Sequence, residues 1–104
     1  MKNKIVTICG SMKFQKDMID VASKLEKEYG WCVIQCVYNL GENLSDKEME
    51  NIKKAHFQKI DISDAIFVLN IGGYIGESTK NEIEYAKKLN KEIIYFEWFK
   101  KSCI

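Results

Sequence analysis

The sequence predicts an α/β protein of the flavodoxin-like kind, with three layers α/β/α and a parallel sheet in strand order 2-1-3-4. Two observations predict this class. Short apolar runs rich in β-branched residues, at 5–9, 32–37, 65–69 and 92–96, are typical of buried strands, and the segments between them carry apolar residues at helical spacing. We therefore expect four strands, or at most five, in a single domain that covers residues 1–104.

The first helix follows the strand at 5–9 and should stop at Gly30, because glycine readily takes the left-handed conformation that ends helices. The second helix should begin at Ser45, since Ser45 and Glu48 fit a capping box, with Leu44 and Met49 placed as a hydrophobic staple. The apolar stripes of the three helices are Phe14, Met18, Val21, Ala22, Leu25 and Tyr29, then Met49, Ile52, His56 and Ile60, then Ile83, Ala86 and Leu89.

In a parallel sheet of this order the ligand lies beyond the carboxyl ends of the strands, where the strand order reverses. That point falls between the first and third strands, so the chemistry should lie in the loops at 9–13 and 70–79. The second loop contains Gly72, Gly73 and Gly76, and Ser78 and Thr79 open the helix after it. These residues suit a cradle for an anion or a sugar, although a sharp strand-to-helix turn also requires glycine.

The charge balance excludes several classes of partner. All 16 basic residues are lysine and 15 residues are acidic, so the one-sided basic surface that binds long nucleic acid is missing. Without arginine, an anion must be held by backbone N–H groups, hydroxyls or lysine. No apolar run approaches the roughly 18 residues of a membrane span and no signal-peptide pattern is present, so we expect a cytoplasmic protein with no membrane partner.

The cysteines do not indicate a metal site. Cys9, Cys32, Cys36 and Cys103 lack Cys-x-x-Cys spacing, and the chain has one histidine. We expect reduced thiols, no metal and no cofactor.

Glu82 lies within the apolar face of the third helix. At 100° per residue, Leu89 and Ala86 fall about 20° and 40° from it on opposite sides, whereas Glu84 falls about 200° away. An inward carboxylate beside the ligand edge is costly unless paired, and such a position is often functional. The alternative is structural, because Thr79 and Glu82 also fit a capping box.

His56 lies on the inward stripe of the second helix. By default such a histidine is buried and satisfied by one hydrogen bond. If the helix continues to the third strand near Asp64, however, His56 sits about 12 Å up at 1.5 Å per residue, close to the ligand edge. We therefore predict that His56 meets Glu82 across the pocket.

Single positions exclude three chemistries of similar folds. A response regulator needs acidic residues where Cys9 and Asn70 stand, and a low-molecular-weight phosphatase needs arginine where Gln15 stands. The nucleoside triphosphate loop Gly-x-x-x-x-Gly-Lys-Ser/Thr is absent. A phosphocysteine carrier that uses Cys9 stays open, although Ser11 is the one hydroxyl left in that loop.

Three segments carry a resemblance to a known family. They are Ile8-Cys9-Gly10-Ser11-Met12-Lys13, then His56-x-x-x-Ile60-x-x-Ser63-Asp64-Ala65-Ile66-Phe67-Val68, then Ser78-Thr79-x-x-Glu82-Ile83-x-Tyr85-Ala86. In order and spacing they resemble the nucleoside 2-deoxyribosyltransferase-like superfamily, which includes deoxynucleotide N-glycosidases. The resemblance covers nearly the whole chain.

The resemblance implies that Glu82 is the nucleophile that attacks the anomeric carbon of a 2-deoxyribosyl group. A covalent sugar-enzyme intermediate would then be resolved by a second base or by water, with net retention. The expected catalytic residues are Glu82 and His56. The expected substrate contacts are Cys9, Gly10, Ser11, Lys13, Asn70, Gly72, Gly73, Tyr74, Gly76, Ser78 and Thr79.

Two positions depart from the family pattern. Where the family usually has aspartate, eight residues before Asp64, this chain has His56, and the nearby Asp61 is out of register. An imidazolium can protonate a departing base, so His56 is a candidate general acid; equally, loss of the carboxylate is compatible with a pocket that binds a nucleotide without cleaving it. Glu84 replaces a frequent glycine on the outer face.

The first hypothesis is an N-glycosidic transferase or hydrolase that acts on a 2-deoxynucleoside or its 5′-monophosphate. The second is a non-catalytic nucleotide-binding module on the same fold, and the third is the phosphocysteine carrier. The expected partner is a small nucleoside or nucleotide. We also expect a homo-oligomer, a dimer or higher, because Trp98 and Phe99 beside the last strand could cover a pocket.

Overall fold

The computed structural model describes residues 3–38 and 41–102, so Cys103 lies outside the described residues. It contains a parallel four-stranded sheet in the order β2-β1-β3-β4, which confirms the predicted fold class and strand order. The strands are β1 (Ile5–Cys9), β2 (Cys32–Ile34), β3 (Ala65–Val68) and β4 (Glu92–Tyr95).

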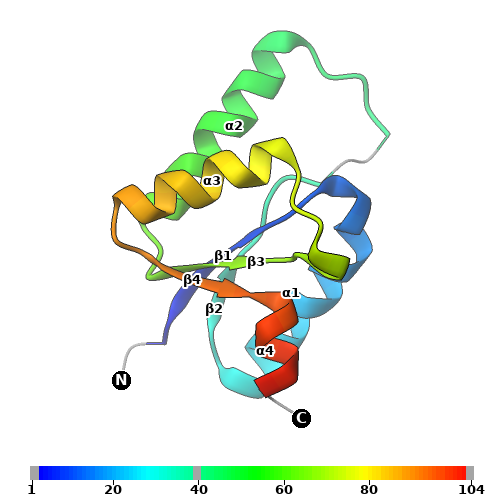
Figure 1. The fold of residues 1–104 in the computed structure, drawn as a ribbon. Helices are drawn as coiled ribbons and strands as arrows, with labels where there is room; N and C mark the ends of the chain where they lie inside the picture. Colours follow the sequence, from blue (N-terminus) through cyan, green and yellow to red (C-terminus); the bar gives the residue numbers. More distant parts are fainter. Residues whose placement is uncertain (1–2, 39–40, 103–104) are drawn as a thin grey trace.

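Helices cover both faces of this sheet. Figure 1 shows α2 and α3 on one face, and α1 and the short α4 on the other. The helices are α1 (Gln15–Tyr29), α2 (Asp46–Asp61), α3 (Glu77–Lys88) and α4 (Phe96–Ser102), and short 3-10 helices lie at Met12–Phe14 and Ile71–Gly73. Within the described ranges, no helix has the length and apolarity needed to span a bilayer.

The alternation of side chains along β1 divides the core into two layers. Val6 and Ile8 pack toward α1, in a cluster with Met18 and Leu25. Cys9 belongs to the opposite layer, which also holds Ile60, Ile66, Val68, Ile83 and Ala86. Cys9 at the end of β1 therefore faces the α2 and α3 side of the sheet.

Thr7, on the same side of β1, fixes α2 through polar contacts. Its hydroxyl lies 2.6 Å from Ser63 Oγ and donates to the carbonyl of Lys59 over 3.1 Å. Asp64 Oδ2 accepts a 2.8 Å hydrogen bond from the Ile5 N–H at the start of β1. Ser63 and Asp64 therefore satisfy buried and strand-end polar groups at the edge opposite the ligand loops.

β2 is shorter than predicted: it ends at Ile34, whereas the sequence predicts a strand that continues to residue 37. Its register with β1 stops at the pair of Thr7 and Ile34. Beyond that pair, the carbonyl of Gln35 accepts a 2.8 Å hydrogen bond from Lys59 Nζ in place of a strand partner. The chain thus leaves the sheet early and passes toward α2.

Both predicted helix boundaries at Gly30 and Ser45 are confirmed. Gly30 has φ +68°, and its N–H donates to the carbonyls of Glu26 and Leu25. At the start of α2, Ser45 Oγ accepts from the Glu48 N–H at 3.1 Å, and Glu48 Oε1 accepts from the Ser45 N–H at 2.9 Å. This is the reciprocal capping box that the sequence predicts.

Three details of the helices differ from the prediction. Tyr29 and Leu89, at the ends of their predicted apolar stripes, are 42% and 40% exposed. Met49 is 57% exposed, because the first half of α2 extends away from the sheet (Figure 1), so the buried part of its stripe begins at His56. In addition, α3 begins at Glu77 with Gly76 as its N-cap, which places Thr79 and Glu82 inside the helix. The capping box of Thr79 and Glu82 is therefore not formed, and that alternative for Glu82 is wrong.

The capping box at Ser45 can be tested by stability. The Ser45→Ala variant loses the acceptor for the Glu48 N–H, and we expect the free energy of unfolding to fall by about 1 kcal/mol. For a domain of this size Tm falls by roughly 4–8 °C, as followed by circular dichroism on heating. The control is Ser23→Ala at an exposed position inside α1, where Tm should hold or rise. An equal fall in both variants would contradict the capping role.

Candidate functional site

A large cavity of about 1300 Å³ opens at the carboxyl edge of β1. Its walls come from the loop after β1, the segment between β2 and α2, the exposed half of α2, and the start of α3. The lining residues are Ile8, Gly10, Ser11, Met12, Cys36, Val37, Tyr38, Glu42, Leu44, Glu48, Met49, Glu50, Asn51, Ile52, Lys53, His56, Phe57, Tyr74, Gly76, Glu77, Ser78, Thr79 and Glu82. The cavity therefore lies where the strand-order argument predicts a ligand.

Three side chains meet where this cavity borders the core. His56 Nε2 lies 3.4 Å from Glu82 Oε1 and 3.5 Å from Cys9 Sγ. The side chains of His56 and Glu82 are only 9% and 16% exposed, and Cys9 is buried beneath them. The predicted meeting of His56 and Glu82 is confirmed. We call Cys9, His56 and Glu82 the Cys-His-Glu cluster.

Each member of the cluster is brought there by a separate element. Cys9 points to this face by the alternation of β1, and His56 is the first buried position along α2. Glu82 lies one residue before the buried Ile83, on the face of α3 that meets α2. Because the elements pack through the apolar residues around them, the three polar side chains share one partly enclosed place.

Burial raises the pKa of the Cys9 thiol well above its usual range, and the negative charge of Glu82 beside it raises that pKa further. The thiol therefore stays protonated at neutral pH in the absence of a bound cation. Burial also raises the pKa of Cys36 in the cavity wall, and it raises that of Tyr38 to about 12. The Cys36 thiol and the Tyr38 hydroxyl therefore line the cavity in their neutral forms.

The Cys-His-Glu cluster is not arranged to activate the thiol. A relay of nucleophile, histidine and carboxylate uses one ring nitrogen for each partner. Here Cys9 and Glu82 both contact Nε2, while Nδ1 of His56 has no hydrogen-bond partner among the described residues. The geometry instead lets the imidazole orient the carboxylate of Glu82.

Several predicted substrate contacts line the cavity. They are Gly10, Ser11, Tyr74, Gly76, Ser78 and Thr79. Gly10 is tightly packed: a Cβ atom there would lie 3.1 Å from Met18 Sδ and 3.3 Å from Leu69 Cβ, so these side chains would have to shift to admit it. The backbone at the end of β1 can therefore lie against the core and still border the cavity.

Five other predicted contacts do not line it: Cys9, Lys13, Asn70, Gly72 and Gly73. Lys13 Nζ lies 3.4 Å from the ring centroid of Tyr74, in a cation–π contact. The Asn70 side chain accepts from the Glu97 N–H at 3.0 Å, and the Gly72 N–H donates to Glu97 Oε2 at 3.2 Å. The first half of the glycine-rich loop therefore holds the start of α4.

Sequence reasoning missed the wall between β2 and α2. Val37, Tyr38 and Glu42 line the cavity there, together with Leu44 and Met49 from the cap region. No motif marks this segment. The one sequence feature that could have indicated this wall is the apolar stretch after Ile34, which the prediction assigns to the second strand.

The cavity wall is acidic. Five glutamates line it, namely Glu42, Glu48, Glu50, Glu77 and Glu82, against one lysine among the described residues, Lys53; Glu50 also pairs with Lys54 at 3.0 Å. The hydrogen bonds of the capping box lower the pKa of Glu48, so this carboxylate is ionised at neutral pH. The wall therefore favours neutral or cationic ligands over anions.

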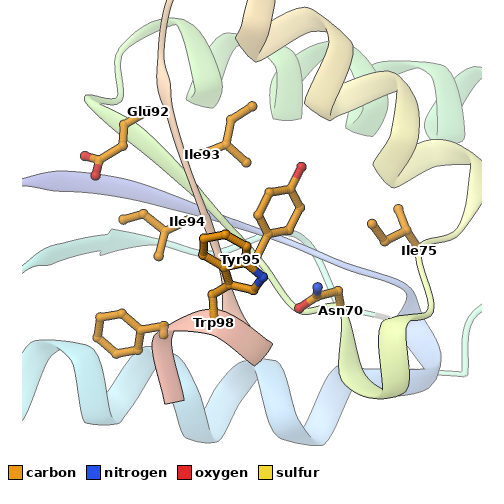
Figure 2. Close-up of a pocket in the computed structure, with 8 residues that line it drawn as sticks. Asn70, Ile75, Glu92, Ile93, Ile94, Tyr95 and Trp98 are labelled. Carbon is orange, nitrogen blue, oxygen red and sulfur yellow. The ribbon is translucent and has the colours of Figure 1, made fainter. Parts of the chain in front are cut away.

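A second hollow, of about 640 Å³, lies along the free edge of β4. Figure 2 shows Ile93, Ile94 and Tyr95 of β4 beside Trp98, with Asn70 and Ile75 across from them. Its one carboxylate, Glu92, pairs with Lys4 at 2.8 Å. The described residues that line this hollow include no cluster of reactive groups, so we place the site in the larger cavity.

Asp61, the out-of-register acid near the family's aspartate position, lies at the end of α2 and accepts a hydrogen bond from Tyr85 Oη. It does not line the cavity, so His56 is the residue that faces Glu82. No family model and no curated protein matches the chain.

The raised pKa of Cys9 predicts an unreactive thiol. At pH 8, Cys9 in the folded protein should be alkylated by iodoacetamide at least about 100-fold more slowly than the exposed Cys32, because it is buried and protonated. Since the pKa of Cys9 is raised, its rate should increase only at a pH above the usual titration range of a thiol. Timed quenching and peptide mass spectrometry measure both rates, and denatured protein is the control in which they converge. Equal rates in the folded protein would contradict the assignment.

Proposed function

We propose that the protein cleaves or transfers the N-glycosidic bond of a 2-deoxynucleoside, with Glu82 as the nucleophile. One observation carries the proposal: a largely enclosed carboxylate borders the cavity, 3.4 Å from the imidazole of His56. Glu82 has no capping role in α3, which begins five residues earlier at Glu77. The resemblance to the nucleoside 2-deoxyribosyltransferase-like superfamily supports the same residue.

The reaction has two displacements. A Glu82 oxygen attacks the anomeric carbon, the bond from that carbon to the base nitrogen breaks, and its electron pair leaves with the base. A proton from solvent or from an acid in the site neutralises the departing base. In the second step, water or another base attacks the same carbon and loses a proton to solvent while the ester bond to Glu82 breaks, which restores the carboxylate with net retention.

His56 is best suited to orient Glu82. Its Nε2 contacts both Glu82 and Cys9, and its side chain is 9% exposed. The ring therefore contacts the carboxylate from the core side and not from the open cavity. An imidazole in this position fixes which carboxylate oxygen faces the substrate. This contact favours the orienting role over that of general acid.

The acidic wall favours a substrate without phosphate. Among the described residues the cavity presents five glutamates and one lysine, and Lys13, a predicted substrate contact, lies on Tyr74 outside the lining. The hydroxyls of Ser11 and Ser78 remain to bind sugar oxygens. We therefore assign the substrate as an uncharged 2-deoxynucleoside.

The phosphocysteine carrier is the weaker alternative. A thiol that accepts phosphate must act as a thiolate, and both burial and the charge of Glu82 raise the pKa of Cys9. A thiol held in its protonated form suits a packing role better than nucleophilic attack.

The nucleophile assignment is tested by Glu82→Gln. With 2-deoxynucleosides, with and without an acceptor base, we expect base release or exchange to fall at least about 10³-fold relative to the unmodified protein, as followed by chromatography. The matched control is Glu84→Gln, two residues away on the exposed face of α3, whose rate should be unchanged. His56→Gln should lower kcat and leave KM nearly unchanged.

Absence of turnover from the unmodified protein, or equal rates for it and for Glu82→Gln, would refute the glycosidic proposal. A rise in Tm on addition of nucleosides without any turnover would indicate the binding module instead. Circular dichroism of each variant establishes that a loss of rate is not a loss of fold.

The preference for an unphosphorylated substrate has its own test. We expect kcat/KM for a 2-deoxynucleoside to exceed that for its 5′-monophosphate by at least about tenfold at low ionic strength, because the wall repels the phosphate. The ratio should shrink as salt screens the glutamates. A monophosphate preference at any salt concentration would contradict this assignment.

A further inference from the structure

We infer that Cys9, His56 and Glu82 form a three-ligand site for a thiophilic divalent cation, best suited to Zn²⁺, with the fourth ligand position open to the cavity. The inference concerns metal binding by the resting protein and does not depend on the glycosidic reaction. It rests on the positions of three ligand atoms, on their chemical types and on the charge of the surrounding wall.

The three ligand atoms have nearly the spacing that a tetrahedral zinc ion needs. Ligands at about 2.0–2.3 Å from the metal lie about 3.3–3.6 Å from one another at tetrahedral angles. Here Sγ and Nε2 are 3.5 Å apart and Nε2 and Oε1 are 3.4 Å apart, and all three atoms lie within 4.8 Å of one another. The sulfur and the carboxylate oxygen, which lie within 4.8 Å of each other, approach to tetrahedral spacing when all three atoms bind one ion.

The donor set selects the type of metal. One sulfur, one imidazole nitrogen and one carboxylate oxygen suit Zn²⁺ or Co²⁺, whereas Mg²⁺ and Ca²⁺ prefer oxygen ligands alone. Three protein ligands with one open position are typical of catalytic rather than structural zinc sites. His56 and Glu82 border the cavity, so a small molecule can reach that fourth position.

The surroundings favour a cation over a proton. Glu42, Glu48, Glu50 and Glu77 stand in the same wall and raise the local concentration of cations. On binding, the Cys9 thiol releases its proton to solvent and the sulfur coordinates as thiolate, since a bound metal deprotonates its thiol ligand. A cation thereby removes the unfavourable placement of a buried carboxylate next to a thiol.

Cobalt substitution tests this site directly. The reduced, full-length chain is freed of metal with a chelator and titrated with Co²⁺. We expect one ion per chain, with a thiolate-to-cobalt charge-transfer band and the intense visible bands of tetrahedral cobalt. Zn²⁺ should displace the cobalt and remove both signals, because it binds such sites more tightly.

Variants decide which residues bind. Cys9→Ser should abolish the charge-transfer band and weaken binding at least about 100-fold, since even loss of an outer-sphere partner costs about 10–100-fold. The matched control, Cys32→Ser at an exposed cysteine, should bind as the unmodified protein does. Glu82→Gln should also weaken binding and alter the visible bands, and it serves as the second variant if Cys9→Ser does not fold by circular dichroism.

The inference is overturned if the unmodified protein gives no charge-transfer band. It is equally overturned if the band survives in Cys9→Ser or disappears in Cys32→Ser, or if folded Glu82→Gln binds cobalt unchanged. Because binding is measured without substrate, failure of the metal site and failure of the glycosidic proposal are separate results.

Discussion

The position of one imidazole nitrogen governs the site. His56 Nε2 lies between Cys9 Sγ at the end of β1 and Glu82 Oε1 on α3, so it joins polar groups of three elements at the border of the cavity. A carboxylate at 16% exposure is unfavourable unless a partner compensates for its lost hydration. The packing of α2 over the sheet places His56 beside Glu82 as that partner. The chemistry of the cavity therefore depends on how α2 packs on the sheet.

The absence of arginine gives the cavity its electrostatic character. All 16 basic residues other than the histidine are flexible lysines, and among the described residues Lys53 is the one lysine that lines the cavity. No guanidinium is available to neutralise the glutamates with a bidentate contact. The wall therefore keeps a negative field, which disfavours phosphate and favours metal cations. The same charge arrangement thus underlies both the substrate assignment and the inferred metal site.

The sheet order and the helix boundaries at Gly30 and Ser45 could be predicted because they depend on local patterns and on general rules of crossover handedness. The meeting of His56 with Glu82 followed from the helical rise and the known edge of ligand binding. The roles of Asn70 and Gly72 could not be predicted, because a glycine-rich loop has the same pattern whether its N–H groups face a ligand or, as here, Glu97. The Cys-His-Glu cluster escaped the cysteine spacing rules because Cys9 and His56 are 47 residues apart.

The two proposed roles of Glu82 compete for the same side chain. As a nucleophile it needs a free, negatively charged oxygen directed at the anomeric carbon, whereas coordination withdraws electron density from that oxygen and holds it beside His56 and Cys9. A protein with bound cation would therefore be a poor glycosidase, and the fraction of active protein would fall as metal occupancy rises. Cys9 distinguishes the two roles, because the glycosidic steps use no thiol while a site for thiophilic metals requires one. A buried thiol beside the carboxylate of Glu82 has no part in the proposed glycosidic steps and a defined part in the proposed metal site.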